Sequence, residues 1–357
     1  METTKHPFPW LDLMDRPAFC VKDGIVVAAN SLAQRRMLRL GMDVREIITD
    51  HRDIYETFQN GCLYLTVTVG EIPCNASITR TEECDVFLLQ QDSDDDQLQA
   101  LALAAQQLRI PLANVMTVAD RLMEDFSNSD SQAQHQVSQI NHNLFQLLRI
   151  ISNMSDASSY KRAPFAGMQT VNLTAVIEEI MEKVQTVSAD TGISISYTGP
   201  DTQIFGLASE EKLERAIYNL LSNGLKFSPQ GSTIDVKLTK NGNLLSFTVC
   251  NQNLEVIHDH SFWSQYRREP SIEDSRFGLG LGMTLVSSVA SAHGGTVLVD
   301  HPTPQETRVT MSILINKDNS GPVRSPAFRI GDYAGGRDKG LLELAEILPT
   351  DAYKNIN

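Results

Sequence analysis

Two long segments with a helical spacing of apolar residues constrain the fold of this chain more than any other feature. In the first segment, steps of three and four residues connect Leu98, Leu101, Ala105, Leu108, Leu112, Val115, Ala119 and Leu122. After a polar loop at 128–131, the same spacing returns at Val137, Ile140, Leu144, Leu147, Ile151 and Met154. Narrow apolar stripes of this kind are typical of helices that pack side by side. We therefore predict an antiparallel helical hairpin over residues 95–158.

One hairpin cannot bury both stripes completely. Pairing two hairpins into a four-helix bundle would bury them, so the sequence predicts a homodimer. Pro111 lies inside the first helix and should kink it, because proline lacks a backbone donor and clashes with the preceding turn. His135 and His142 fall between the stripe positions of the second helix. We expect both histidines to face solvent.

Residues 10–92 have the pattern of a small α+β domain. Two short apolar runs, Ala18–Val21 and Ile25–Ala28, flank an Asp-Gly pair that is common between paired strands. Asn30 then begins a helical stretch, and strand-like runs follow. The stretch 17–34, PAFCVKDGIVVAANSLAQ, resembles part of a PAS sensor domain. A dimerisation domain that binds no ligand remains the alternative.

Two further segments follow the hairpin. Residues 165–316 alternate helical and strand-like patterns and contain a glycine-rich loop before a helix, which indicates a separate α/β domain. Residues 317–357 consist of a polar linker and an amphipathic tail whose helical piece is 341–348. The apolar face of this tail is suited to docking on the body of the protein or on a partner. The predicted fold class is multidomain α+β.

Three separated motifs resemble those of sensor histidine kinases in order and spacing. QQLRIPL at 106–112 is similar to the H-box of the family, NLLSNGLKFS at 219–228 to its N-box, and GLGLGM at 278–283 to its glycine-rich G2 box. The resemblance covers residues 97–316. It implies a HisKA-like dimerisation hairpin followed by an ATPase domain of the GHKL type, which is an α/β sandwich. It also implies ATP and Mg²⁺ as ligands, and a response regulator or another histidine kinase as partner.

The chemistry of the residues agrees with nucleotide binding. Asn219 and Asn223 are four residues apart and share one helix face. The amide oxygen of Asn223 is a suitable hard ligand for Mg²⁺, and Lys226 can bring a cation to the same phosphates. Three glycines complete the candidate set: phosphates could approach the backbone N–H groups of Gly278, Gly280 and Gly282.

The chain departs from the family at the reacting centre. Gln106 stands where the phosphoacceptor histidine is expected, and Gln107 stands where a glutamate commonly acts as the base. A carboxamide is neither a nucleophile nor a base, because its nitrogen lone pair is delocalised into the carbonyl. Autophosphorylation at the usual position is therefore excluded.

The adenine-recognition motif, Asp-x-Gly-x-Gly in the family, is altered as well. Here it reads Asn251-Gln252-Asn253-Leu254-Glu255. Asn251 can still accept a hydrogen bond from the adenine amino group, but without a charge. The change weakens binding by about 1–2 kcal/mol, roughly tenfold in affinity. The side chains of Asn253 and Glu255 also replace two glycines beside the base.

Three functions are consistent with these residues. The favoured one is a degenerate histidine kinase, or pseudokinase, that acts as a dimeric signalling adaptor. The second is an ATP-dependent enzyme that acts in trans, as a kinase or as a phosphatase of a response regulator. The third is a purely structural dimeric scaffold.

Charge and cysteine content restrict the partners and the compartment. With 30 basic and 44 acidic residues, the net charge of −14 opposes binding to nucleic acid. Five scattered cysteines without a C-x-x-C spacing fit a reduced, cytoplasmic environment. No apolar run has the length of a transmembrane helix, so no membrane span is expected.

Overall fold

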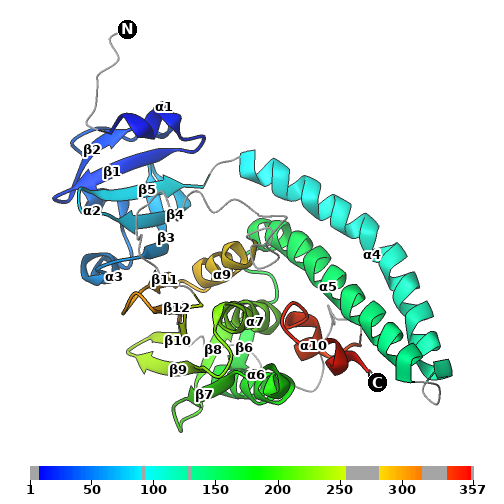
Figure 1. Cartoon of the computed structure of the whole chain (residues 1–357). Coiled ribbons are helices and arrows are strands. Elements are labelled where there is room, and N and C mark those ends of the chain that lie inside the picture. The colour runs from blue at the N-terminus through cyan, green and yellow to red at the C-terminus, as the bar shows by residue number, and fades with distance from the viewer. Residues whose placement is uncertain (1–7, 91–92, 127–130, 255–280, 316–335, 355–357) are drawn as a thin grey trace.

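The computed structural model describes residues 8–90, 93–126, 131–254, 281–315 and 336–354. Among the helices in these ranges, none combines the length and the hydropathy of a membrane span. Three structural units follow one another along the chain, and a C-terminal segment, residues 336–354, packs between the second and the third (Figure 1).

The first unit is an antiparallel sheet of five strands in the order β2-β1-β5-β4-β3. Asp23 and Gly24 connect the first two strands with positive φ angles of 52° and 79°, as a tight turn between twisted strands requires, so the predicted hairpin is confirmed. Asn30 caps the following helix by accepting a hydrogen bond from the Ala33 N–H at 2.9 Å. The elements are η1 (Pro9–Leu13), β1 (Ala18–Lys22), β2 (Ile25–Ala29), α1 (Ser31–Arg35), α2 (Val44–Ile47), α3 (Arg52–Thr57), β3 (Cys62–Val69), β4 (Ile72–Arg80) and β5 (Asp85–Leu89).

The second unit is the helical hairpin that the apolar stripes predict, formed by α4 (Ser93–Phe126) and α5 (Ser131–Arg162). Helix α4 continues through Pro111 and changes direction about halfway along its length (Figure 1). One of the two apolar rows of the pattern is buried, namely Ala105, Leu112 and Ala119 on α4 and Val137, Leu144 and Ile151 on α5, and further apolar residues such as Met116, Phe145 and Leu148 are buried beside it.

The second apolar row of the hairpin remains accessible. It consists of Leu108, Val115, Leu122, Ile140 and Leu147, whose exposed fractions lie between 37% and 51%. These residues also recur every seven positions, each three after a buried one. One copy of the hairpin therefore satisfies only half of the apolar pattern.

The third unit is a sheet in the order β11-β12-β10-β9-β7 with helices packed against one face (Figure 1). Alternate residues of β9 and β10, such as Val236 and Phe247, are buried beneath these helices, while their neighbours face away. Strands β6 and β8 form a separate two-stranded sheet. The elements are β6 (Gln169–Asn172), α6 (Leu173–Val187), η2 (Ala189–Thr191), β7 (Ser194–Thr198), β8 (Phe205–Ala208), α7 (Glu210–Phe227), β9 (Thr233–Asn241), β10 (Leu244–Gln252), α9 (Leu281–Ala292), β11 (Val297–Asp300) and β12 (Glu306–Leu314).

The sheets of the first and third units are joined into one sheet of 10 strands. Strand β3 pairs antiparallel with β11, so that Cys62, Leu63 and Tyr64 lie opposite Val299, Leu298 and Val297. Beyond this short seam, the Thr66 hydroxyl lies 2.8 Å from the Ser291 hydroxyl of α9. The first unit therefore contacts the third directly, in addition to their connection through the hairpin.

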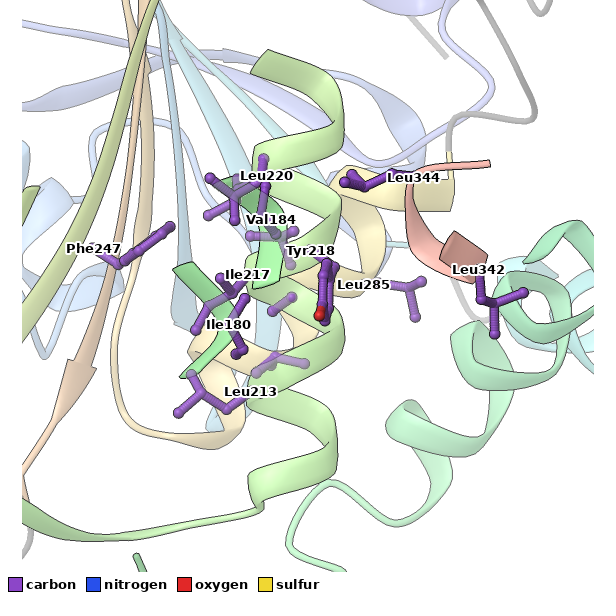
Figure 2. Close-up of a cluster of buried hydrophobic side chains, with 14 of the residues drawn as sticks. Ile180, Val184, Leu213, Ile217, Tyr218, Leu220, Phe247, Leu285, Leu342 and Leu344 are labelled. Atoms are coloured by element: carbon purple, nitrogen blue, oxygen red, sulfur yellow. The ribbon is translucent and has the colours of Figure 1, made fainter. Parts of the chain in front are cut away.

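The C-terminal segment docks on the body of the protein, which was one of the two predicted options. Its elements are α10 (Lys339–Glu343) and η3 (Thr350–Tyr353), so the regular helix is shorter than the predicted 341–348. Leu342 and Leu344 extend the apolar core around α7, which α6, α9 and β10 also line (Figure 2). Tyr353 is fully buried and stacks on the ring of His142 at 4.8 Å.

This docking corrects the expectation for one of the two hairpin histidines. His135 is exposed as predicted, but His142 is half-buried and donates a hydrogen bond to the Ala345 carbonyl at 2.7 Å. The stripe pattern of α5 describes only the contact with α4, and the C-terminal segment covers a second face of the same helix.

Candidate functional site

Helix α7 carries the predicted Asn219, Asn223 and Lys226. The helix begins after Ser209, whose backbone N–H donates to the Nε2 atom of His293 at 3.1 Å. Acidic residues occupy its first turn and Lys226 its last turn, and both interact favourably with the helix dipole. Most of α7 is buried, so the positions of its polar side chains are fixed by the surrounding core.

Asn219 lies against the start of α9. It is 2% exposed, and its Nδ2 atom donates to the Arg215 carbonyl at 2.8 Å. Its Oδ1 atom would be only 3.0 Å from a Cβ atom placed on Gly282, the second residue of α9. The N-box and the end of the G2 box are therefore adjacent, and the absence of a side chain at Gly282 permits this approach.

Asn223 and Lys226 follow about one and two turns further along α7. Asn223 is half-buried. The Lys226 ammonium group pairs with the Glu346 carboxylate of the C-terminal segment, with 2.7 Å between Nζ and Oε2. A cation that the sequence assigns to phosphate is thus held by a carboxylate in this structure.

The described residues contain no cluster of three or more His, Cys, Asp or Glu side chains arranged to hold a metal. The Asn223 amide oxygen is the candidate protein ligand for a Mg²⁺ ion here, together with the phosphates of a nucleotide. That donor set fits Mg²⁺, which retains several waters and is commonly bound through few protein oxygens plus substrate phosphates.

Asn251 lies at the end of β10 and is 6% exposed. Its Nδ2 atom donates to the Gln252 carbonyl at 2.9 Å, which leaves the side-chain oxygen as the group that can accept from a ligand. The Thr307 hydroxyl of β12 donates a hydrogen bond to the Oδ1 atom of Asn253 at 2.8 Å. The Leu254 N–H donates to the Phe227 carbonyl at 3.0 Å, so this segment returns to the end of α7.

Gln106 and Gln107 are both exposed on α4. Arg109, three residues after Gln106, donates to the Ser152 hydroxyl of α5 at 3.2 Å. From the same helix, Arg149 donates to the Ser222 hydroxyl at 2.9 Å, directly beside Asn223. Helix α5 therefore links the H-box helix to the N-box helix. The predicted Gly278 and Gly280, together with Glu255, lie outside the described residues.

A buried charge cluster beside α7 was not predicted. Arg215 is fully buried and pairs with Asp156 of α5, with 2.7 Å between Nη2 and Oδ2, and with the fully buried Glu343. Burial raises the pKa of Asp156, and the nearby Arg215 offsets that rise only in part. The sequence carried one signal for this cluster, since Glu343 and Glu346 interrupt an otherwise apolar stretch in the tail.

One family match covers the region of the chain that contains α7, β10 and α9. Residues 208–317 match the family described as histidine kinase-, DNA gyrase B-, and HSP90-like ATPase. The sensor histidine kinase CusS of Escherichia coli (strain K12) is 28% identical over 233 residues, which are 63% of this chain and 45% of CusS. Sensor protein KdpD of Clostridium acetobutylicum is 27% identical over 195 residues, which are 53% of this chain and 21% of KdpD.

Among solved structures, full-length ShkA in complex with AMPPNP is 22% identical, with a TM-score of 0.46, over 61% of this chain and 46% of that chain. The chain spans less than half of the length of CusS and of KdpD.

Proposed function

We infer from the membership of this chain in the histidine kinase family that it is a dimeric, ATP-binding signalling adaptor without autophosphorylation at the usual position. The observation that carries this proposal is the approach of Asn219 to Gly282, with Asn223 and Lys226 on the same helix, while Gln106 stands at the H-box position. The binding side of the site is retained, and the phosphoacceptor is missing.

Each retained residue has a definite part in nucleotide binding. The Asn223 amide oxygen would ligate Mg²⁺, which neutralises charge on the phosphates when it is bound. Lys226 would supply a cation to the same phosphates once it leaves Glu346. The backbone N–H groups at the start of α9 have no partners within the helix, and Gly282 lets phosphate oxygens approach them.

Gln106 supports a role other than phosphate transfer through this helix. Its carboxamide offers no lone pair for attack on a phosphoryl group, and Gln107 offers no base. The output of the protein is then a conformation, which the first unit, proposed to be a PAS-like sensor, can bias and a partner can recognise. We propose a response regulator or another histidine kinase as that partner, and the five unpaired cysteines support a cytoplasmic location.

The second apolar row of the hairpin supports a homodimer. Leu108, Val115 and Leu122 on α4 repeat every seven residues and remain accessible, together with Ile140 and Leu147 on α5. A second copy that presents the same row would bury both by symmetry, because a twofold interface is self-complementary.

A second candidate function is an ATP-dependent activity toward a partner, in trans. The presence of Asn219, Asn223 and Lys226 on one helix face favours it, because their amide and ammonium groups suit a metal ion and phosphates. Both candidates require that the chain binds nucleotide.

Calorimetric titration of the full chain with Mg-ATP tests the shared requirement. We expect saturable binding that Asn223→Ala weakens by about tenfold to a hundredfold, because hydrogen bonds and metal contacts to charged groups contribute about 1.5–3 kcal/mol. Asn143→Ala, which removes an exposed asparagine from α5, serves as the matched control and should leave the affinity unchanged.

Incubation with γ-labelled ATP distinguishes the two candidates. The adaptor predicts no acid-labile phosphate on the protein and no phosphate transfer to a response regulator. Transfer to an added regulator would favour the second candidate, and phosphohistidine on this chain would refute the adaptor. An absence of nucleotide binding at millimolar concentration would refute both.

A further inference from the structure

The C-terminal segment binds at a junction of four helices. Arg337 pairs with Asp120 of α4 at 2.8 Å, and Asp338 pairs with Lys183 of α6 at 2.7 Å. Lys339 pairs with Glu214 of α7. On α5, the Gln146 side chain donates to the Ala345 carbonyl at 3.0 Å, and Ser138 donates to the Thr350 carbonyl. The segment therefore connects the hairpin to the third unit, which contains α6 and α7.

A balanced set of charges lies under this segment. Arg149, Arg215 and Lys226 are basic, and Asp156, Glu343 and Glu346 are acidic. Buried charges are stable only when they are paired, and removing one partner leaves the other uncompensated. Two of the three carboxylates come from the C-terminal segment, so the basic side chains of α5 and α7 would lose ion-pair partners if the segment undocked.

Glu346 connects this set to the nucleotide site. Its Oε1 atom lies 3.4 Å from Nη1 of Arg149 on α5, and its Oε2 atom lies 2.7 Å from Nζ of Lys226 on α7. Burial would raise the pKa of the Glu346 carboxyl group, but the two cations outweigh burial and lower the pKa below its usual value. The carboxylate is consequently ionised at neutral pH.

Two anions beside the Lys226 ammonium group repel each other and share one compensating charge, so each weakens the binding of the other. A carboxylate and a phosphate both bind an ammonium group through charged oxygens at about 2.7–2.9 Å. We propose that the Glu346 carboxylate competes with the phosphates of a bound nucleotide for Lys226, so that docking of the C-terminal segment lowers nucleotide affinity. This inference rests on the nucleotide site proposed above and adds a regulator to it.

The competition has a reciprocal consequence. If the docked segment weakens nucleotide binding, then nucleotide must weaken docking of the segment by the same factor. Nucleotide binding would thereby loosen the connection between the third unit and α5. The adaptor would then have two conformations, one with the segment docked and one with it released. A partner that binds residues 336–354 would increase nucleotide affinity.

Two variants of the full chain distinguish competition of Glu346 for Lys226 from a general contribution of Glu346 to docking of the segment. Glu346→Gln keeps the shape of the side chain and removes the charge that faces Lys226. Asp338→Asn is the matched control, because it removes an ion pair of the same length, to Lys183, elsewhere in the segment. Asparagine also retains the capping bond that Asp338 makes to the Leu341 N–H.

We expect Glu346→Gln to bind Mg-ATP about threefold to tenfold more tightly than the unmodified chain. Asp338→Asn breaks a half-exposed pair and weakens docking only slightly, so its affinity should rise by less than about twofold. Equal affinity of Glu346→Gln and the unmodified chain would overturn the competition and leave the proposed function intact. Equal tightening in both variants would assign the effect to docking in general and overturn the role of Glu346. Absence of binding by Glu346→Gln, the form predicted to bind most tightly, would overturn the inference and the proposed function together.

Two measurements do not depend on the affinity of a variant. The first is acylation of lysines by an amine-reactive ester in the folded chain, followed by mass spectrometry. Lys226 should react about threefold to fivefold faster in Glu346→Gln, and Lys183 should do so in Asp338→Asn. The second is hydrogen exchange of residues 339–348 in the unmodified protein, which should accelerate when Mg-ATP is added. Unchanged reactivity of Lys226 or unchanged exchange would contradict the proposal.

Discussion

Replacement of Gly61 by alanine tests the seam between the first and third units. Gly61 precedes β3 and has a φ of +86°, and a Cβ atom added there would lie 1.9 Å from the Val299 carbonyl oxygen of β11. Gly41 has nearly the same φ, +85°, but an added Cβ atom would meet no atom within 4 Å. The pair therefore separates the backbone effect of the substitution from its effect on the seam.

The expected losses follow from these contacts. Both substitutions place an alanine in the left-handed region, which costs about 1–2 kcal/mol. At Gly61 the two strands must also move apart by about 1 Å, because real Cβ atoms essentially never lie within 3.0 Å of another heavy atom. Loss of about two seam hydrogen bonds at about 1 kcal/mol each gives an additional destabilisation of about 2 kcal/mol.

Urea denaturation measures the free energy of unfolding of both variants, and hydrogen exchange of residues 297–299 reports on the seam itself. We expect Gly61→Ala to lose more stability than Gly41→Ala and to exchange faster at those residues. Equal stability losses, or unchanged exchange in Gly61→Ala, would refute the pairing of β3 with β11.

Other substitutions test the remaining features of the structure. Burial lowers the pKa of His293, so below the unfolded-state pKa of about 6.5 the unfolded chain binds a proton that the folded chain excludes. We therefore expect the melting temperature to fall as the pH decreases from 7 to 5.5, and to fall less steeply in His293→Gln. A parallel decrease in both proteins would contradict this role of His293. Arg215→Met should reduce the free energy of unfolding by about 3 kcal/mol, because its buried carboxylate partners remain, whereas Arg308→Met, which breaks a surface pair, should cost less than about 1 kcal/mol in the same urea titration. Val115→Glu should convert the dimer to a monomer in sedimentation velocity, whereas Asn114→Glu on the same helix should not, and a dimeric Val115→Glu protein would exclude the proposed interface.

Features set by local periodicity could be predicted from the sequence. The seven-residue repeat is a property of neighbouring turns, so the hairpin and its two apolar rows were predictable without any tertiary information. The face shared by Asn219 and Asn223 follows from helix geometry in the same way. The adjacency of Asn219 and Gly282 is a finding of the structure, because residues 63 positions apart carry no local signal of their contact.

Features set by contacts between distant segments could not be predicted. Arg215 and Glu343 are 128 residues apart, and neither residue alone indicates that the other is its partner. The position of His142 depends on the same segment, which covers a face of α5 that the stripe pattern leaves polar. The pairing of β3 with β11 was also beyond prediction, because a strand edge carries no residue type that specifies its neighbour.

The β3–β11 seam also determines what the protein would present if its units separated. Within the joined sheet, β3 has a neighbour on each side, and so does β11. Separation would unpair Cys62–Tyr64 of β3 from 297–299 of β11, and β3, which is mostly apolar and contains no charge, would then be a sheet edge along its whole length. Unpaired edges of this kind are templates for aggregation or for the addition of a strand from another protein. A state with the two units apart would therefore expose an apolar strand edge to which a strand of a partner could add.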